Sequence, residues 1–244
     1  MNSRMKPEPF DRTRFLEFLE KECGILPGDA VLVGVSGGAD SLFLLWHLHE
    51  NGFRTTAATF NHQLRPSAAD EAEFVRRTCI EWSVPFLGGT QDVMSYARQR
   101  NLSTEEAARE CRYRFLFAEA EKIGAAAVAT GHHADDQAET VLMHFIRGSG
   151  PDGLAGMRPR TFFPQWSKTI PLVRPILPIS RTEIESWCLE KGLQPVSDES
   201  NMDNNYFRNR LRNRLIPLLE AEYNPQIRKN INKTARVIQT DLDW

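Results

Sequence analysis

The sequence predicts a doubly wound α/β fold, with helices flanking a mostly parallel sheet, followed by a helical C-terminal extension. Short β-rich runs alternate with helix-length segments, as parallel strands joined by crossover helices require. Polar or glycine-rich segments directly follow three of the predicted strands. Because parallel α/β sheets bind ligands beyond the carboxyl ends of their strands, any chemistry is expected at that edge.

The N-terminal part begins with a helix and then a strand. Phe15, Phe18 and Leu19 recur at helical spacing, so we expect a short helix over 11–22. The apolar run 30–35 is the first predicted strand.

Glycine and β-propensity set the next boundaries. A helix opens at Asp40 and ends near Gly52, because glycine is common just beyond a helix. β-rich residues predict a second strand at 55–60. Helical spacing returns over 67–82, and 84–87 is the third predicted strand.

A capping box marks the following helix, since Ser103 and Glu106 have the spacing that lets their side chains bond first-turn amides. A fourth strand follows at 125–130, and another helix is expected over 134–147. The apolar residues expected to face the core are Ala107, Cys111, Phe115 and Ala118 on the first of these helices, and Ala138, Val141, Leu142 and Phe145 on the second.

The segment 148–156 is too rich in glycine for regular structure, so we expect a mobile substrate loop there. A second capping box, Ser180 with Glu183, begins a helix that stops at Gly192.

Composition narrows the class of protein. With 244 residues, 41% of them hydrophobic, the chain can form one large domain, or a domain with a smaller appendage, without disulfides. Its four cysteines form no C-x-x-C pair, so they indicate reduced thiols and neither a zinc site nor a disulfide scaffold. No run is long and apolar enough for a membrane span or a secretory signal, and we therefore expect a soluble, cytoplasmic protein.

The turn Ser36-Gly-Gly-Ala-Asp-Ser41 joins the first strand to the next helix and predicts a phosphate site. Its glycines allow close approach of an anion, and a helix N-terminus offers unpaired N–H groups and a positive dipole. It lacks the lysine of the Walker loop, and Asp40 stands where Mg²⁺ could bridge to phosphates. The alternative is a plain turn in which Ser36 or Asp40 caps the helix.

An acidic pair, Asp136 and Glu139, lies near the start of the 134–147 helix, on the face opposite its expected core residues. These carboxylates could bind an ammonium group, hold a metal or accept a proton. Acidic residues that merely favour the helix dipole are the alternative. We favour the functional interpretation because His132 and His133 stand at the same strand end.

Basic residues supply further candidates. Arg109 and Arg112 share a helix face and could neutralise charge on phosphate oxygens, although surface arginines are common. His62 is a candidate because it follows the second strand. Residues 205–236 hold eight Lys/Arg against two Glu, in a chain of net charge −2. RNA is a plausible partner of this basic segment, and an ordinary solvated helix face is the alternative.

Several motifs occur in a characteristic order: Ser-Gly-Gly-Ala-Asp-Ser at 36–41, Asn-His-Gln-Leu-Arg at 61–65, Glu-Ala-Ala-Arg-Glu-Cys-Arg-Tyr at 106–113, Gly-His-His-Ala-Asp-Asp-Gln-Ala-Glu-Thr at 131–140, Arg-Gly-Ser-Gly-Pro-Asp-Gly-Leu at 147–154, and Asp-Glu-Ser-Asn with Arg-Asn-Arg-Leu-Arg between 198 and 212. On these motifs the chain resembles the N-type ATP pyrophosphatases (PP-loop superfamily) and, within them, the tRNA(Ile)-lysidine synthase family. The resemblance covers about 31–219.

The resemblance implies an adenine nucleotide alpha hydrolase-like fold, with a catalytic PP-loop domain over 1–215. Residues 216–244 would then be a helical linker or the start of a tRNA-binding region. It implies a ligase that joins free L-lysine to C2 of the wobble cytidine of tRNA(Ile) with a CAU anticodon. An adenylated base is the intermediate, ATP and Mg²⁺ are required, and AMP and pyrophosphate are released. A homodimer is compatible with it.

The resemblance also implies roles for single residues. Asp40 would hold Mg²⁺, and Asp136 and Glu139 would orient lysine and help to deprotonate its ammonium group. Arg109 and Arg112 would stabilise the phosphates or the adenylate. The pyrophosphate cradle would be Ser36, Gly37, Gly38, Ala39 and Ser41; His62 and His133 would line the nucleotide site; and Arg174, Arg208 and Arg212 would contact lysine or tRNA.

Two departures and two alternatives stay open. Asn61 stands where some relatives have Asp, and many relatives carry further C-terminal domains, so we expect a shortened chain or a minimal member. One alternative is a tRNA thiolase of the same superfamily, although the lack of paired cysteines speaks against it. The other is a non-catalytic nucleotide- and RNA-binding module, in which Asp136 and Glu139 would be dispensable.

Overall fold

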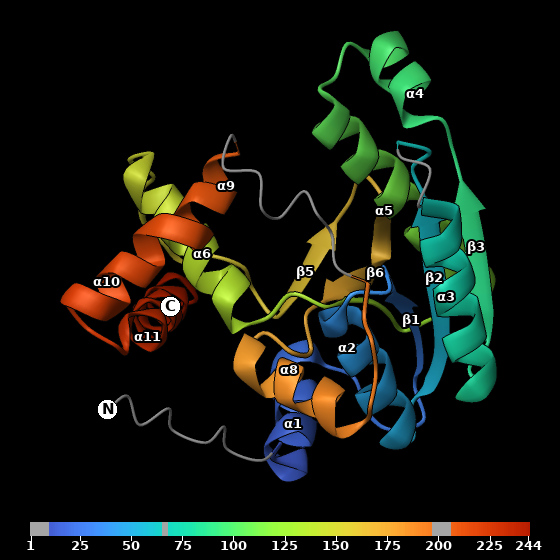
Figure 1. Ribbon diagram of the computed structural model, residues 1–244, viewed down its shortest axis with the longest axis horizontal. Coiled ribbons are helices and arrows are strands. Elements are labelled where there is room, and N and C mark those ends of the chain that lie inside the picture. The colour runs from blue at the N-terminus through green and yellow to red at the C-terminus, as the bar shows by residue number, and fades with distance from the viewer. Residues whose placement is uncertain (1–9, 65–67, 197–205) are drawn as a thin grey trace.

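A six-stranded sheet forms the centre of the protein in a computed structural model that describes residues 10–64, 68–196 and 206–244 (Figure 1). Its order is β3-β2-β1-β4-β6-β5. All neighbours pair in parallel except β5 and β6, which confirms the mostly parallel sheet. The strands are β1 Ala30–Gly34, β2 Arg54–Asn61, β3 Phe86–Thr90, β4 Ala127–Thr130, β5 Arg160–Phe163 and β6 Ser167–Val173.

Helices cover both faces of this sheet, as a doubly wound fold requires. Val31 and Val33 of β1 pack toward the helices of one layer, and Leu32 between them packs toward α5 on the other face. This alternation follows from the two-residue period of a strand. The first layer contains α1 Arg12–Phe18, α2 Ala39–Glu50, α3 Ala68–Glu81 and α8 Arg181–Glu190; the second contains α5 Thr104–Lys122, against which α4 Val93–Arg100 packs.

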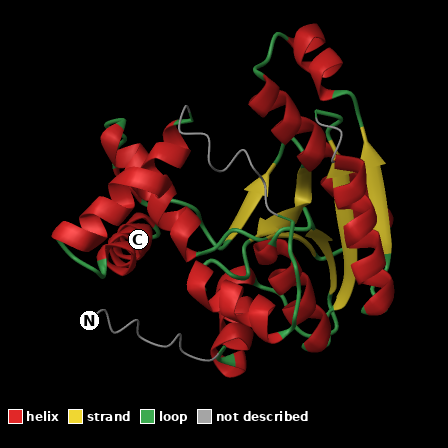
Figure 2. Ribbon diagram, viewed as in Figure 1, coloured by secondary structure: helices red, strands yellow, loops and turns green. Residues whose placement is uncertain are grey.

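The remaining helices gather beside the sheet, and they confirm the predicted helical C-terminal extension (Figures 1 and 2). Asn232 of α11 donates to the carbonyl oxygen of Ala134 at 2.8 Å, and Gln239 donates to that of Met157 at 3.1 Å. These bonds fix α11 against the start of α6 and the segment after α7. The group comprises α6 Ala134–Ile146, α7 Pro151–Leu154, α9 Phe207–Arg210, a π-helical segment Leu211–Leu215, α10 Ile216–Glu222 and α11 Ile227–Leu242. The domain boundary after residue 215 stays a prediction.

The sequence did not predict α4, β5 or β6. Asp92 caps the start of α4, where its carboxylate accepts the Ser95 N–H at 3.0 Å, and Asn101 caps its end in a left-handed conformation. β6 contains Pro171, a residue that ordinarily argues against a strand. The ladder tolerates it because the pairing of β6 with β4 begins only at Leu172. The third strand, expected at 84–87, runs instead over Phe86–Thr90.

Three expectations about burial and loops were wrong. Ala118 is exposed, because α5 turns Leu116 and Phe117 toward the sheet instead. Phe145 was expected in the core but is 66% exposed, since the end of α6 extends beyond the sheet layers. The segment 148–156 is not irregular throughout, as the helical turn Pro151–Leu154 forms within it.

Within the described ranges, every helix is too short or too polar to cross a membrane.

Candidate functional site

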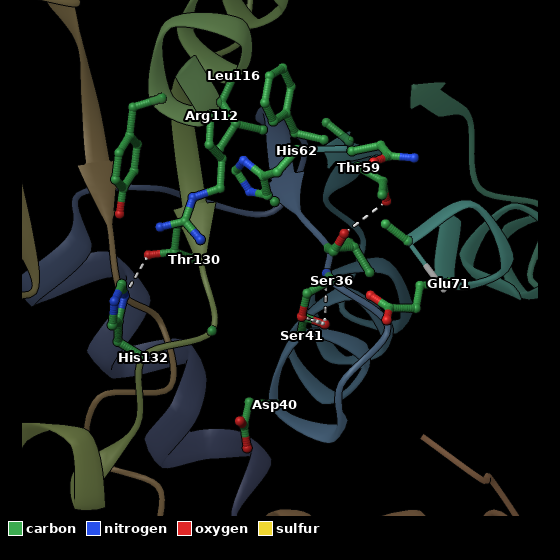
Figure 3. Close-up of a pocket in the computed structure, with 18 of the residues that line it drawn as sticks. Ser36, Asp40, Ser41, Thr59, His62, Glu71, Arg112, Leu116, Thr130 and His132 are labelled. Atoms are coloured by element: carbon green, nitrogen blue, oxygen red, sulfur yellow. Dashed lines mark hydrogen bonds between the residues drawn. The ribbon is translucent and has the colours of Figure 1, made fainter. Parts of the chain in front are cut away.

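A cavity of about 560 Å³ opens at the carboxyl ends of β1, β2 and β4 (Figure 3). β1 lies between β2 and β4, so the chain reverses its winding direction here, and α/β folds bind ligands at such switch points. The volume lies within the usual range for small-molecule sites. The polar residues that line the cavity are Ser36, Asp40, Ser41, Thr59, Asn61, His62, Glu71, Arg112, Tyr113, Thr130 and His132.

The predicted phosphate loop forms one wall of the cavity. Gly37 adopts a φ of +86°, which favours glycine, and Gly38 is the N-cap of α2 with no side chain bonded to the helix start. The first helical bond runs from Leu42 N to the Gly38 carbonyl at 3.1 Å. The N–H groups of the preceding turn, residues 39–41, therefore have no acceptor within the helix and can bind an anion.

Ser41 holds this loop in shape. Its hydroxyl accepts the Ser36 N–H at 3.2 Å and donates to the Gly38 carbonyl at 2.9 Å. Neither Ser36 nor Asp40 caps the helix, so the plain capped turn considered above does not form. The side chain of Ser41 thus preorganises an open anion site.

Asp40 belongs to the phosphate loop and lines the cavity, with its side chain 38% exposed. Burial raises the pKa of its carboxyl, and the nearby His133 partly offsets that effect. No cluster of three or more metal-ligating side chains occurs in the described ranges. A Mg²⁺ ion fits Asp40 nevertheless, because this ion accepts one or two carboxylates and completes its shell with phosphate oxygens and water.

His132, and not His133 as expected, lines the cavity. His132 lines the cavity, where its Nδ1 lies 2.9 Å from the Thr130 hydroxyl (Figure 3). Burial and the nearby Arg174 lower the pKa of His132 to about 3, so its ring is neutral at physiological pH. His133, expected to line the nucleotide site, is only 1% exposed and lies outside the cavity lining.

His133 instead lies between two carboxylates, that of Asp40 in the phosphate loop and that of Asp136 in the acidic pair. Its Nδ1 accepts the Asp135 N–H at 3.2 Å, so the ring carries its proton on Nε2 when neutral. Nε2 lies 3.6 Å from Oδ1 of Asp40 and 3.4 Å from Oδ2 of Asp136. The phosphate loop and the acidic pair are therefore neighbours through one buried imidazole.

The predicted arginines fall into two environments. The guanidinium groups of Arg109 and Arg112 lie 4.8 and 5.1 Å from the ring centroid of Tyr113, and Arg112 also lines the cavity. Arg174 is only 5% exposed, and its Nη1 donates to the Arg158 carbonyl at 2.6 Å. The same Nη1 lies 3.1 Å from the Thr161 hydroxyl of β5, so Arg174 supports β5 from inside the protein, and its contact with substrate stays a prediction.

Two arginines of the C-terminal group cover the acidic pair. Arg208 Nε lies 2.8 Å from Glu139 Oε2, and Arg212 Nε lies 2.6 Å from Glu139 Oε1. Both arginines also approach Asp136 Oδ1, at 2.9 and 3.1 Å. Glu139 consequently has no exposed surface, although its helix face was expected to point away from the core.

These contacts favour the ionised form of Asp136. Burial opposes the charge of Asp136, but His133 and Arg208 outweigh it and hold the pKa of its carboxyl below the usual value. Two carboxylates and two guanidinium groups balance each other in this cluster. The pair can therefore hold cations, and in this structure it holds those of the protein itself.

Two cavity residues have no local signal in the sequence. Glu71 belongs to a helix with several acidic residues, and only the packing of α3 beside β2 turns its side chain toward the phosphate loop (Figure 3). Thr59 donates to the Val35 carbonyl at 2.7 Å and closes the loop from the β2 side. Arg65 and the motif at 198–201 lie outside the described residues.

A comparison with protein families gives one match over most of the chain, since a family model for the PP-loop domain matches residues 8–219. The chain belongs to the PP-loop domain family. The phosphate loop at the end of β1 lies within the matched residues and agrees with the assignment.

Curated relatives of this PP-loop chain include tRNA(Ile)-lysidine synthases. That of Geobacillus kaustophilus is 40% identical over 230 residues, which cover 92% of this chain and 48% of the relative. That of Dehalococcoides mccartyi is 38% identical over 237 residues, which cover 94% and 50%. The chain thus spans about half the length of the curated relatives it matches.

Solved structures confirm the fold class of the PP-loop chain. A U34-tRNA thiolase from Methanococcus maripaludis has a TM-score of 0.73 at 18% identity, covering 93% of this chain and 78% of that one. An NH3-dependent NAD synthetase from Campylobacter jejuni has a TM-score of 0.53 at 15% identity, covering 94% and 97%. At these identities the likeness concerns the fold alone.

Proposed function

We propose that the chain carries the catalytic part of a tRNA(Ile)-lysidine synthase, which joins free L-lysine to C2 of the wobble cytidine in tRNA(Ile) with a CAU anticodon. One observation carries the proposal: His133 lies within 3.6 Å of both Asp40 at the phosphate loop and Asp136 of the acidic pair. An anion site and a cation site thus lie side by side. The relatives named tRNA(Ile)-lysidine synthase support the same conclusion.

In the first step the C2 oxygen of the cytidine attacks the α-phosphorus of ATP, and pyrophosphate leaves. The first-turn N–H groups of α2 bind the leaving group, while Arg112 stabilises charge on the phosphate that is transferred. Asp40 would hold Mg²⁺, which supplies charge neutralisation of the pyrophosphate when bound. Arg112 and the neutral ring of His132 line the part of the cavity where the base and the phosphate would meet.

In the second step the ε-amine of lysine attacks C2 of the adenylated base, and AMP leaves with the former C2 oxygen. Free lysine is mostly protonated at neutral pH and must lose a proton before it attacks. The carboxylates of Asp136 and Glu139 would bind that ammonium group, and Asp136, whose pKa lies below its usual value, would orient it. Arg208 and Arg212 occupy the same carboxylates in the structure, so lysine must share or displace these contacts.

The test mixes the chain with ATP, Mg²⁺, radiolabelled lysine and a CAU-anticodon tRNA(Ile) transcript at high concentration. We expect label in the RNA together with equal amounts of AMP and pyrophosphate. A transcript with uridine at the wobble position is the matched control and should stay unlabelled. Asp136→Asn should abolish transfer, and full transfer by this variant would contradict the role of the acidic pair.

A thiolase reaction is the alternative, and the same tRNA with a labelled sulfur donor tests it. The cysteines of the chain do not favour it. All four are buried and free, and burial raises the pKa of Cys23 to about 12 and those of Cys79 and Cys188 to about 11. Thiols of this kind are poor nucleophiles.

Location and assembly also belong to the proposal. Free buried thiols suit the cytoplasm, where tRNA is modified before translation. A homodimer stays a prediction that sedimentation of the chain tests directly.

A further inference from the structure

Exposed apolar side chains gather where α6 ends and α9 begins. Phe145 is 66% exposed, Ile146 48% and Tyr206 57%. The guanidinium of Arg147 lies 5.4 Å from the ring centroid of Phe207, which ties the end of α6 to the start of α9. Arg147 directly follows Ile146 and Phe207 directly follows Tyr206, so this contact brings the end of α6 and the start of α9 together.

We call this surface the α6–α9 platform and define it by Phe145, Ile146, Arg147, Tyr206, Phe207 and Arg210. The platform is not part of the core, since Phe145, Ile146 and Tyr206 are all exposed. Monomeric proteins rarely gather large apolar side chains at one exposed place unless a partner binds there. The platform is therefore a binding surface.

The positive charge of the platform indicates which kind of partner it binds. Arg210 lies 5.5 Å from the Phe207 ring, so two guanidinium groups approach the same aromatic side chain. The segments 142–151 and 206–219, which form the platform and its surroundings, contain arginines and no Asp or Glu. Aromatic faces combined with arginine suit unpaired nucleic-acid bases and their phosphates.

The position of the platform relates it to the cavity. α6 starts at Ala134, next to His133 and the phosphate loop, and its 13 residues lead to the platform. At 1.5 Å per residue the helix spans roughly 20 Å. An RNA loop with its target base in the cavity would therefore lay neighbouring nucleotides along α6 toward the platform.

We propose that the α6–α9 platform binds unpaired bases of an RNA loop, which stack on Phe145 and Tyr206 while Arg147 contacts a phosphate. The proposal rests on the proposed function for the choice of RNA. It concerns binding alone, and it requires neither ATP nor lysine.

The experiment measures fluorescence anisotropy of a labelled 17-nucleotide stem-loop carrying a seven-nucleotide loop, titrated with the full chain. A fully paired duplex of equal length is the RNA control. The variant is Phe145→Ala with Tyr206→Ala, and the protein control is Tyr223→Ala, which removes another exposed tyrosine at the far end of α10. ATP binding by each variant shows that the cavity is intact.

We expect the double variant to lose stem-loop affinity by roughly tenfold for each stacked base, while duplex binding and ATP binding stay unchanged. Tyr223→Ala should bind the stem-loop like the unmodified chain. Arg147→Gln should lower the salt dependence of binding by about one released counterion.

Stem-loop binding by the double variant that equals that of the unmodified chain would overturn the proposal. The proposal would also be overturned if the unmodified chain sedimented as a dimer and the double variant as a monomer. The platform would then join two copies of the chain. If the unmodified chain transfers no lysine and yet the double variant loses stem-loop affinity, the platform is supported and only the reaction is defeated.

Discussion

Arg212 Nε lies 2.6 Å from Oε1 of Glu139, although the two residues are 73 positions apart in the chain. With Arg208 it buries Glu139 completely and closes the C-terminal helices over α6. The contact joins the part of the chain expected to bind RNA to the part expected to bind an amine. Any chemistry at Asp136 and Glu139 therefore depends on the position of the C-terminal segment that carries Arg208 and Arg212.

Loss of Arg212 should destabilise the protein, because it leaves a buried carboxylate with one cation fewer. We expect Arg212→Ala to lower the free energy of unfolding by about 3 kcal/mol in urea denaturation. Burial disfavours the free charge of Arg212, yet its bond to Glu139 outweighs this and raises the pKa of Arg212. The control is Arg181→Ala, which breaks a half-exposed pair with Glu185 and should change little. Equal effects of both variants would show that the buried pair adds no stability.

Gly131→Ala should weaken ATP binding. A Cβ at this position would lie 3.1 Å from the backbone of Asp40 and from Ser41 N, so the phosphate loop would have to move. Because that contact is with backbone, we expect about 1–3 kcal/mol of destabilisation and at least a tenfold loss of affinity by calorimetry. Gly150→Ala is the matched control, with a φ of −71° and open space around its Cβ. Unchanged ATP affinity of Gly131→Ala would mean that the loop does not bind the nucleotide.

His133→Asn should impair turnover with little loss of stability. Asparagine also caps a helix, so the start of α6 should persist. Its shorter side chain cannot reach Asp40, which His133 Nε2 approaches to 3.6 Å. We expect kcat to fall about tenfold through misplaced carboxylates, while the melting temperature changes by only a few degrees. A variant with normal kcat would remove His133 from the positioning of the site.

His47 should make the protein sensitive to mild acid. It is buried among Phe10, Phe43 and Trp187, and burial together with Lys191 lowers the pKa of His47 to about 4. The unfolded chain binds this proton near pH 6.5, so the stabilisation is complete above that pH and is lost as the pH falls toward 4. The two pKa values correspond to about 3 kcal/mol of unfolding free energy. Urea unfolding at pH 7.5 and 4.5 measures the loss.

His47→Leu should flatten this pH dependence by the same amount, because leucine takes up no proton. The other titrating groups, His132 among them, contribute equally in both proteins and cancel in the difference. An identical pH dependence in the variant would contradict the assignment to His47.

Local sequence determined most of the secondary structure and the position of the phosphate loop. The capping box of Ser103 and Glu106 forms as predicted, with the Glu106 N–H donating to the Ser103 hydroxyl at 3.2 Å. The loop from Ser36 to Ser41 follows a buried strand and opens a helix. Such features were predictable because they depend on residues a few positions apart, whose spacing alone selects a helix, strand or turn.

Only the tertiary structure decided which side chains meet. Phe145 and Glu139 lie on the same helix, and the apolar one is exposed while the acidic one is buried. Helical periodicity says which residues share a face, but it does not say whether sheet, solvent or another helix covers that face. Arg208 and Arg212 reach Glu139 because α9 and the segment after it pack on α6. Contacts across some 70 residues depend on the packing of whole elements, and no local pattern in the sequence encodes them.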